Sequence, residues 1–266
     1  MTKKNTTEWW QEQYGFFGNF YLEGDNSLEG YLIKKQQNLA ERTKTEVKGL
    51  IKLLKLSKGQ SILDMPCGYG RHSLGLTKKG YLVTGVDINS VHLSVARKKA
   101  KQENLKIKFV KNNMREINYK ETFDAAINLF YSFGFFTSDK ENYQTLRNFY
   151  TALKPGGKFL MHTDVNIPRI IKGKYKEDEV RQLANGKKLH IIDRYSSKTK
   201  RIEGTWIITS EKNQEIRRDY SVRVYTKNEF MGLCQQVGFK KCRAYGDWEG
   251  NKYSKNSEDM IIVAEK

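Results

Sequence analysis

The chain of 266 residues contains only three cysteines, Cys67, Cys234 and Cys242. Their odd number and wide spacing argue against a disulfide framework, and the intervals between them do not match metal-binding motifs. The sequence has no apolar run long enough to span a membrane, and its first residues lack the apolar stretch of a signal peptide. We therefore expect a cytoplasmic protein that binds no metal and does not enter a membrane.

Acidic residues are scarce relative to basic ones: 30 Asp and Glu stand against 48 Lys and Arg, which gives a net charge of +18. The positive charge is mostly lysine and is spread along the chain, without one dominant tract. Two interpretations stay open: a lysine-rich solvated surface, or a positive field that attracts an anionic substrate or RNA. A content of 38% hydrophobic and 12% aromatic residues is typical of a globular protein.

Short apolar strands alternate with amphipathic helical segments from about residue 40 onward. This alternation predicts an α/β fold with a doubly wound, mostly parallel, seven-stranded sheet covered by helices on both faces. The expected strands are 61–65, 81–87, 106–110, 123–130, 157–163, 240–248 and 259–266, and the expected helices are 40–56, 71–79, 90–103, 139–153 and a last one after Thr226.

The alternation is interrupted by residues 165–225. Residues 165–185 are polar and suggest loose helix, whereas three alternating runs within 188–225 predict antiparallel strands across the mouth of the parallel sheet. The aromatic-rich residues 1–40 form a third unit, which we expect to act as a cap or lid. The predicted core is therefore 41–164 together with 226–266, and 165–225 is a substrate-binding insertion.

The stretch ILDMPCGYGRHSL, residues 62–74, places a glycine turn between a strand and a helix. A P-loop needs Lys followed by Ser or Thr, which is absent, and a dinucleotide fingerprint needs a glycine where Ser73 stands. The pattern that fits is an acid, Asp64, followed by Gly68 and Gly70. An acid there suits a cationic amine, and Asp87 at the end of the next strand can accept from ribose hydroxyls. Both features suit S-adenosyl-L-methionine.

Several blocks strengthen this interpretation: ILDMPCGYGRHSLGLTKKGYLVTGVDIN, NNMRE, INLFYSFGFF, LKPGGKFLMHT, and the late RVYT and YGDWEG. Together they resemble class I S-adenosylmethionine-dependent methyltransferases, over roughly Glu41 to the C-terminus. Within that family they are similar to a bacterial small-molecule branch of sugar amine and glycine N-methyltransferase-like enzymes. The resemblance implies S-adenosyl-L-methionine as cofactor, S-adenosyl-L-homocysteine as product, and a Rossmann-like fold with an antiparallel insertion.

The resemblance also assigns residues to the cofactor. They are Asp64, Cys67, Gly68 and Gly70 around the methionine part, Asp87 and Ile88 at the ribose and one adenine face, Asn113 and Met114 at the adenine, and Asn128, Leu129 and Phe130 beside the sulfonium. Many relatives have aspartate at position 113, and the Asn113 carbonyl can still accept from the adenine amino group. Cys67 is interpreted as a packed loop residue rather than a nucleophile, since nothing near it marks it as activated.

Candidates for the acceptor side lie beyond the carboxyl ends of the fourth and fifth strands. Tyr131 either lines the acceptor pocket or is packed, and His162 with Asp164 are the best-placed proton acceptors, although a buried, satisfied His162 is the alternative. The insertion and the N-terminal segment add substrate-binding candidates, namely Tyr21, Arg194, Trp206, Arg218 and Tyr220, and the lid candidates Tyr14 and Tyr31.

The sequence therefore predicts methyl transfer to N or O of a small, anionic or sugar-like metabolite by in-line displacement. An RNA methyltransferase and a non-catalytic cofactor-binding module are the alternatives. A monomer and a homodimer are both compatible with the sequence.

Overall fold

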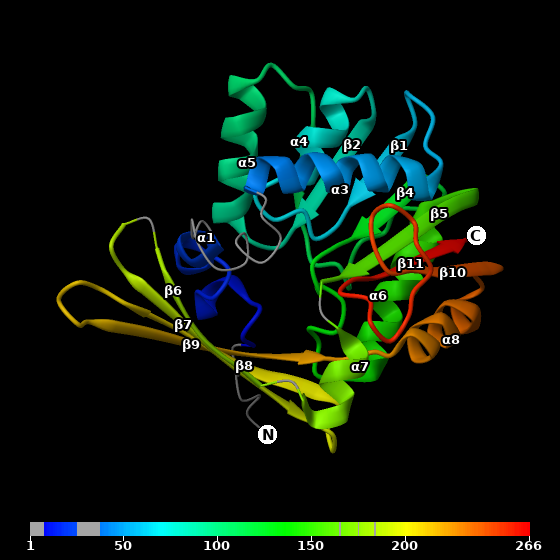
Figure 1. Ribbon diagram of the computed structural model, residues 1–266. Coiled ribbons are helices and arrows are strands. Elements are labelled where there is room, and N and C mark those ends of the chain that lie inside the picture. Colours follow the sequence, from blue (N-terminus) through cyan, green and yellow to red (C-terminus); the bar gives the residue numbers. More distant parts are fainter. Residues whose placement is uncertain (1–7, 26–37, 165, 175, 184) are drawn as a thin grey trace, which may run out of the picture.

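Figure 1 shows the computed structural model of the chain, in which residues 8–25, 38–164, 166–174, 176–183 and 185–266 are described. Its core is a seven-stranded sheet in the order β10-β11-β5-β4-β1-β2-β3. β1 to β5 are parallel, and β11 runs antiparallel between β5 and β10. The predicted fold class is confirmed. The strands are β1 Ser61–Asp64, β2 Leu82–Asp87, β3 Lys108–Lys111, β4 Phe123–Asn128, β5 Leu153–Thr163, β10 Lys241–Tyr245 and β11 Met260–Glu265.

Helices cover both faces of this sheet, as the apolar strand sequences require. The neighbours Ile62 and Leu63 of β1 are both fully buried, but they belong to different apolar clusters. Ile62 packs in the cluster with α3 and α4, and Leu63 packs in the cluster with α6 and α8. Burying each such side chain contributes about 1.5–3 kcal/mol. The helices are α3 Leu39–Leu54, α4 Arg71–Lys78, α5 Ser90–Gln102, α6 Asp139–Ala152 and α8 Lys227–Val237.

The start of α8 follows the predicted capping pattern. The Thr226 hydroxyl accepts from the Glu229 backbone N–H, and the Glu229 carboxylate accepts from the Thr226 N–H, at 3.2 and 2.9 Å. This exchange satisfies two backbone donors that the helix itself leaves unpaired.

A second sheet holds four antiparallel strands in the order β6-β7-β8-β9, and it extends to one side of the core (Figure 1). Its strands are β6 Lys176–Gln182, β7 Lys188–Ser196, β8 Arg201–Thr209 and β9 Glu215–Arg223. The three predicted strands are present, preceded by the short α7 Ile167–Arg169 and the π-helical turn η2 Ile170–Lys174. The expectation of loose helix through 185 is wrong for β6, because this edge strand pairs only with β7 and needs no apolar face.

The N-terminal segment lies between the second sheet and the core (Figure 1). It contains the 3₁₀ turn η1 Glu12–Tyr14 and helix α1 Asn19–Asp25. Phe16 and Phe20 pack in one apolar cluster with residues of β7 and β8. On the core side, the Trp9 ring lies 4.8 Å from that of Phe135, and Glu12 pairs with Lys111 at 2.7 Å. The segment thus joins the two sheets, while Tyr31 lies outside the described residues.

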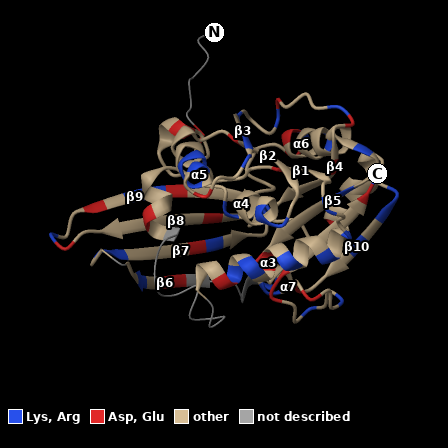
Figure 2. Ribbon diagram, turned by 90° about the horizontal axis from the view of Figure 1, so that it is seen from above, with Lys and Arg blue, Asp and Glu red and all other residues tan. Residues whose placement is uncertain are grey.

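Charge is distributed over the whole molecule. In Figure 2, lysine and arginine occur on the helices of the core and on the long strands of the second sheet, interspersed with acids. None of the helices in the described ranges has both the length and the apolar character that crossing a bilayer demands.

Candidate functional site: a pocket at the carboxyl ends of the parallel strands

A pocket opens at the carboxyl ends of β1, β2 and β4, where the chain order of the strands reverses and α/β sheets bind ligands. It encloses about 1050 Å³ of empty space, its open mouth included. The lining residues are Trp10, Phe17, Tyr21, Leu39, Arg42, Asp64, Met65, Pro66, Cys67, Gly68, Tyr69, Gly70, Arg71, His72, Val86, Asp87, Ile88, His92, Asn112, Asn113, Met114, Leu129, Phe130, Ser132, Phe135 and Phe136.

The two glycines of the turn have different reasons to lack a side chain. Gly68 has φ +53° and open space where a Cβ would stand, so its backbone faces the pocket. Gly70 has φ +81°, and a Cβ there would come within 2.9 Å of Ala96 and 3.2 Å of Phe109. The absence of a side chain at Gly70 therefore lets the glycine turn pack closely against α5 and β3. Cys67 lies between β1 and these glycines. Burial and the charge of Asp87 raise the pKa of its thiol, so the thiol is neutral and is not activated as a nucleophile.

Asp64 ends β1 inside the pocket wall, with 2% of its surface exposed. The hydroxyl of Ser73 donates a hydrogen bond to Oδ2 of Asp64 at 2.6 Å. Ser73, which occupies the position of the third glycine in a dinucleotide-binding motif, therefore holds the Asp64 carboxylate. Burial raises the pKa of Asp64 to about 7, against the hydrogen bond from Ser73, and the charge of Asp87 adds to the rise. A buried acid of this kind gains most from a ligand that brings a positive charge.

Asp87 ends β2 on the opposite side of the glycine turn. Its Oδ2 accepts from the Gly68 N–H and its Oδ1 from the Asn89 N–H, both at 2.8 Å. Burial raises the pKa of Asp87 to about 6, although these backbone hydrogen bonds oppose the rise. Each carboxylate oxygen accepts more than one hydrogen bond, so both oxygens remain able to accept from a ligand diol.

The turn after β3 brings Asn112, Asn113 and Met114 to the pocket. The side-chain carbonyl of Asn113, which we expected to accept from the adenine amino group, is bonded to Arg115. It accepts from the backbone N–H of Arg115 at 3.0 Å and from the side-chain Nε of Arg115 at 3.4 Å. That oxygen is therefore engaged within the protein. The side chains of Ile88 and Met114 supply apolar contact surface to the pocket.

The loop after β4 is strained. Phe130 and Tyr131 have φ values of +56° and +59°, a region that residues other than glycine rarely adopt. Leu129 and Phe130 line the pocket. Asn128 does not: it is fully buried below the loop, and its Nδ2 donates to the Met65 carbonyl at 3.1 Å.

The three expected catalytic residues lie outside the described pocket lining. His162 is fully buried on β5, with Nε2 3.4 Å from the Asp259 carboxylate and its ring 4.7 Å from that of Trp248. Asp164 pairs with Arg42 at 3.5 Å. Burial raises the pKa of Tyr131 well above its usual range, so its phenol stays protonated. The His162 side chain is thus buried and packed, and Tyr131 is partly buried against the core.

A charged cluster that the sequence did not reveal lies at the Phe130 side of the pocket. The guanidinium carbons of Arg42 and Arg71 each lie 4.4 Å from the Phe130 ring centroid. Both arginines pair with Glu46, which is 1% exposed and also contacts His72 Nε2 at 2.9 Å. Burial and the charge of Arg71 lower the pKa of His72 to about 4, so the imidazole is neutral. This wall therefore offers guanidinium donors to an anionic group of a ligand.

Among the expected substrate residues, only Tyr21 lines the described pocket. Its ring stacks on Trp206 at 5.6 Å with planes 10° apart, so Trp206 supports Tyr21 from the second sheet. The Arg218 guanidinium lies 5.8 Å from the Tyr14 ring centroid and 6.0 Å from that of Phe20, within the N-terminal segment.

Two further residues of the insertion point elsewhere. The Tyr220 hydroxyl donates to the buried Asp193 carboxylate. Arg194 follows Asp193 in β7, so its side chain lies on the opposite face of the sheet, where it is exposed and pairs with Asp178 at 3.9 Å. Arg194 therefore does not share a face with Trp206, which the strand pairing sets opposite Ile191.

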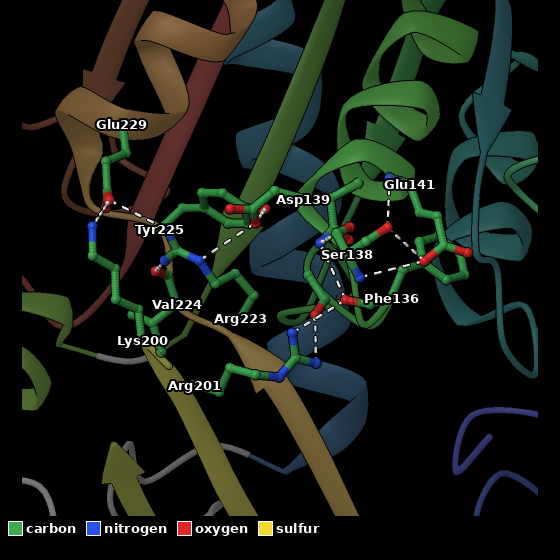
Figure 3. Close-up of polar contacts among 12 residues, drawn as sticks. Phe136, Ser138, Asp139, Glu141, Lys200, Arg201, Arg223, Val224, Tyr225 and Glu229 are labelled. Atoms are coloured by element: carbon green, nitrogen blue, oxygen red, sulfur yellow. Dashed lines mark hydrogen bonds and ion pairs between the residues drawn. The ribbon is translucent and has the colours of Figure 1, made fainter. Parts of the chain in front are cut away.

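A polar network fastens the second sheet to the pocket (Figure 3). Arg201 of β8 donates to the Phe136 carbonyl at 3.1 Å, next to the side chain that lines the pocket. Arg223 of β9 lies 3.3 Å from Glu229 of α8 and 3.5 Å from Asp139 of α6. These contacts hold the loop before α6 in place.

The chain is similar to known proteins over most of its length. Residues 62–157 match the family described as "Methyltransferase domain". A protein of Geobacillus sp. (strain WCH70) named as a methyltransferase is 27% identical over 212 residues, which cover 77% of this chain and 84% of that one. The glycine/sarcosine N-methyltransferase of Aphanothece halophytica is 25% identical over 251 residues, 90% of this chain and 89% of that one.

Solved structures share the fold. The amino pentose methyltransferase CalS10 of Micromonospora echinaspora, determined with S-adenosylmethionine bound, superimposes with a TM-score of 0.64 at 18% identity. The match covers 90% of this chain and 98% of that one.

Proposed function

We propose, for a chain that belongs to the class I S-adenosylmethionine-dependent methyltransferases, that the acceptor is the nitrogen of a small-molecule amine. The observation that carries this proposal is the distribution of acids in the pocket. Among the described lining residues, Asp64 and Asp87 are the only acids, and both belong to the glycine turn and the strand ends beside it. The general-base candidates that the sequence suggested, His162 and Asp164, are outside that lining. The two histidines within it, His72 and His92, are weak bases, because burial lowers the pKa of each to about 4.

The residues of the pocket fit the cofactor. Asp64 suits its ammonium group, Asp87 suits its ribose hydroxyls, and the side-chain-free Gly68 leaves room beside them. Ile88 and Met114 provide apolar contacts for a base, and Arg42 and Arg71 provide donors for a carboxylate. When bound, the cofactor supplies a methyl group already activated on a sulfonium. The protein then has to align the acceptor and exclude water.

Aromatic rings dominate the rest of the wall. Phe17, Tyr21, Phe130 and Phe135 come from the N-terminal segment and from the loop after β4. Ring faces favour the positive charge that is dispersed during methyl transfer from a sulfonium. A neutral amine attacks with its own lone pair, whereas a hydroxyl needs a base to take its proton. The names of the glycine/sarcosine and amino pentose methyltransferases support an amine as well.

A paired acceptor panel tests the proposal. Each amine is matched with its hydroxyl counterpart: glycine with glycolate, and an amino sugar with the parent sugar. With methyl-labelled cofactor, we expect label only in amine members. The variant His190→Ala, at a partly exposed position outside the described pocket lining, is the active control. Label in hydroxyl members alone would contradict the proposal.

Cofactor affinity should depend on pH. We expect the affinity for S-adenosylhomocysteine to fall at least tenfold between about pH 8 and pH 5, because the carboxyls of Asp64 and Asp87 must be ionised to bind. Both pKa values are raised in the folded chain, so protonating these acids does not unfold it. Calorimetry across this range measures the effect, and Asp64→Asn should bind weakly with a flatter profile. A flat profile for the wild type would contradict the assignment.

An RNA acceptor stays an alternative, based on the net charge of +18. It predicts RNA binding that weakens steeply with salt, which filter binding measures directly.

A further inference from the structure

His92 lies in the pocket wall and has no role in the site described above. It occupies the first turn of α5, five residues after Asp87, and its backbone N–H donates to the capping side chain of Asn89 at 3.0 Å. Only 3% of its surface is exposed. The helix cap and the burial together fix the imidazole at the pocket.

The imidazole Nε2 is buried, and within the described part of the chain it makes no hydrogen bond. Its surroundings are three rings, with centroids at 5.8 Å for Tyr21, 6.1 Å for Tyr69 and 6.3 Å for Phe17. Burial lowers the pKa of His92 to about 4, so the ring is neutral near pH 7 and can either donate or accept one hydrogen bond. A buried polar atom without a partner is destabilising, which points to a partner that arrives with a ligand.

The position of His92 indicates which part of the ligand this is. Tyr69, whose ring meets the imidazole edge-on at 89°, directly follows Gly68, and the Gly68 N–H binds the Asp87 carboxylate. His92 is therefore on the glycine-turn side of the pocket, together with Asp87. Phe130, on the loop after β4, instead lies beside the guanidinium groups of Arg42 and Arg71.

We infer that His92 Nε2 hydrogen-bonds a ribose hydroxyl of the bound nucleoside, beside Asp87, and is a cofactor-binding residue. This inference rests on the proposed placement of the cofactor in this pocket. It assigns a second polar contact to the ribose, in addition to Asp87. Because His92 is neutral near pH 7, it can be replaced by an uncharged residue without changing the charge of the pocket.

Ligand truncation combined with two substitutions tests the inference. His92→Met removes the hydrogen-bonding atom while keeping an apolar side chain among the rings, and His92→Gln offers an amide in its place. The ligands are S-adenosylhomocysteine, 5′-methylthioadenosine, which lacks the amino acid part, and the 2′-deoxy and 3′-deoxy forms of the latter. His190→Met, at a partly exposed histidine of β7 outside the described pocket lining, is the matched control.

We expect His92→Met to weaken S-adenosylhomocysteine and 5′-methylthioadenosine by the same factor, about 3- to 10-fold. His92→Gln should recover part of the loss, and one deoxy ligand should bind His92→Met and wild type equally. Unchanged affinity in His92→Met, or an equal loss with both deoxy ligands, would overturn the inference. A reduced turnover with unchanged S-adenosylhomocysteine affinity would also overturn it, because it would place the contact on the acceptor. If the wild type bound none of these nucleosides, the proposed function itself would fail.

Discussion

Replacing Asp87 by alanine should weaken S-adenosylhomocysteine binding about 100-fold or more, since hydrogen bonds to a charged group contribute about 1.5–3 kcal/mol each. The substitution removes the charged acceptor for the ribose. It also releases the N–H groups of Gly68 and Asn89, which the Asp87 carboxylate holds at 2.8 Å. Isothermal calorimetry at neutral pH measures the change.

Two variants make this result specific. Asp87→Asn keeps one side-chain acceptor oxygen, so its loss should be smaller than that of Asp87→Ala. Asp219→Ala removes an exposed acid from the outer face of the second sheet and should bind normally. An Asp87→Ala protein that is folded and binds within twofold of the wild type would contradict the assignment of the ribose site.

Replacing Glu46 by leucine should lower the free energy of unfolding by about 3–5 kcal/mol, the usual cost of removing one partner of a buried ion pair. Glu46 is 1% exposed and holds the guanidinium groups of Arg42 and Arg71 together with His72. Without it, two like charges face each other across the Phe130 ring. Denaturant unfolding of both proteins measures the difference, and Glu116→Leu, at an exposed position after β3, is the control.

The sign of the pH dependence provides a second check on Glu46. Burial alone raises its pKa, but the hydrogen bond from His72 and the charges of Arg71 and Arg42 outweigh burial, and the net shift is downward. A lowered folded pKa means that the stabilisation is present above the unfolded value, near 4.3, and is lost as the pH falls below it. The stability difference between wild type and Glu46→Leu should therefore narrow from about pH 5 to pH 3. A constant difference over this range would contradict the ion-pair account.

The regular elements of the core could be predicted from sequence because their signals are local. An apolar run, a capping pair or a glycine turn specifies its own backbone, and Thr226 with Glu229 shows this at α8. β6 carries no such signal. It is a polar edge strand whose conformation depends on pairing with β7, so it could only be found with the sheet already assembled.

The part of the site that local motifs specify could likewise be predicted from the sequence. Asp64, Gly68 and Asp87 lie in the pocket because motif spacing and the strand ends bring them there. The cluster of Arg42, Glu46 and Arg71 was not found, since its contacts join α3 to the start of α4 across at least 25 positions. His162 was expected at the reaction site because it ends a central strand. Which way it points depends on Trp248, which follows β10, the next strand but one in the sheet.

The most direct test of the central claim is a crystal structure of the protein with S-adenosylhomocysteine. We expect the ribose within hydrogen-bonding distance of Asp87, the base between Ile88 and Met114, and the amino group near Asp64. A nucleoside bound elsewhere, for instance in the second cavity between α3 and residues 246–259, would contradict it.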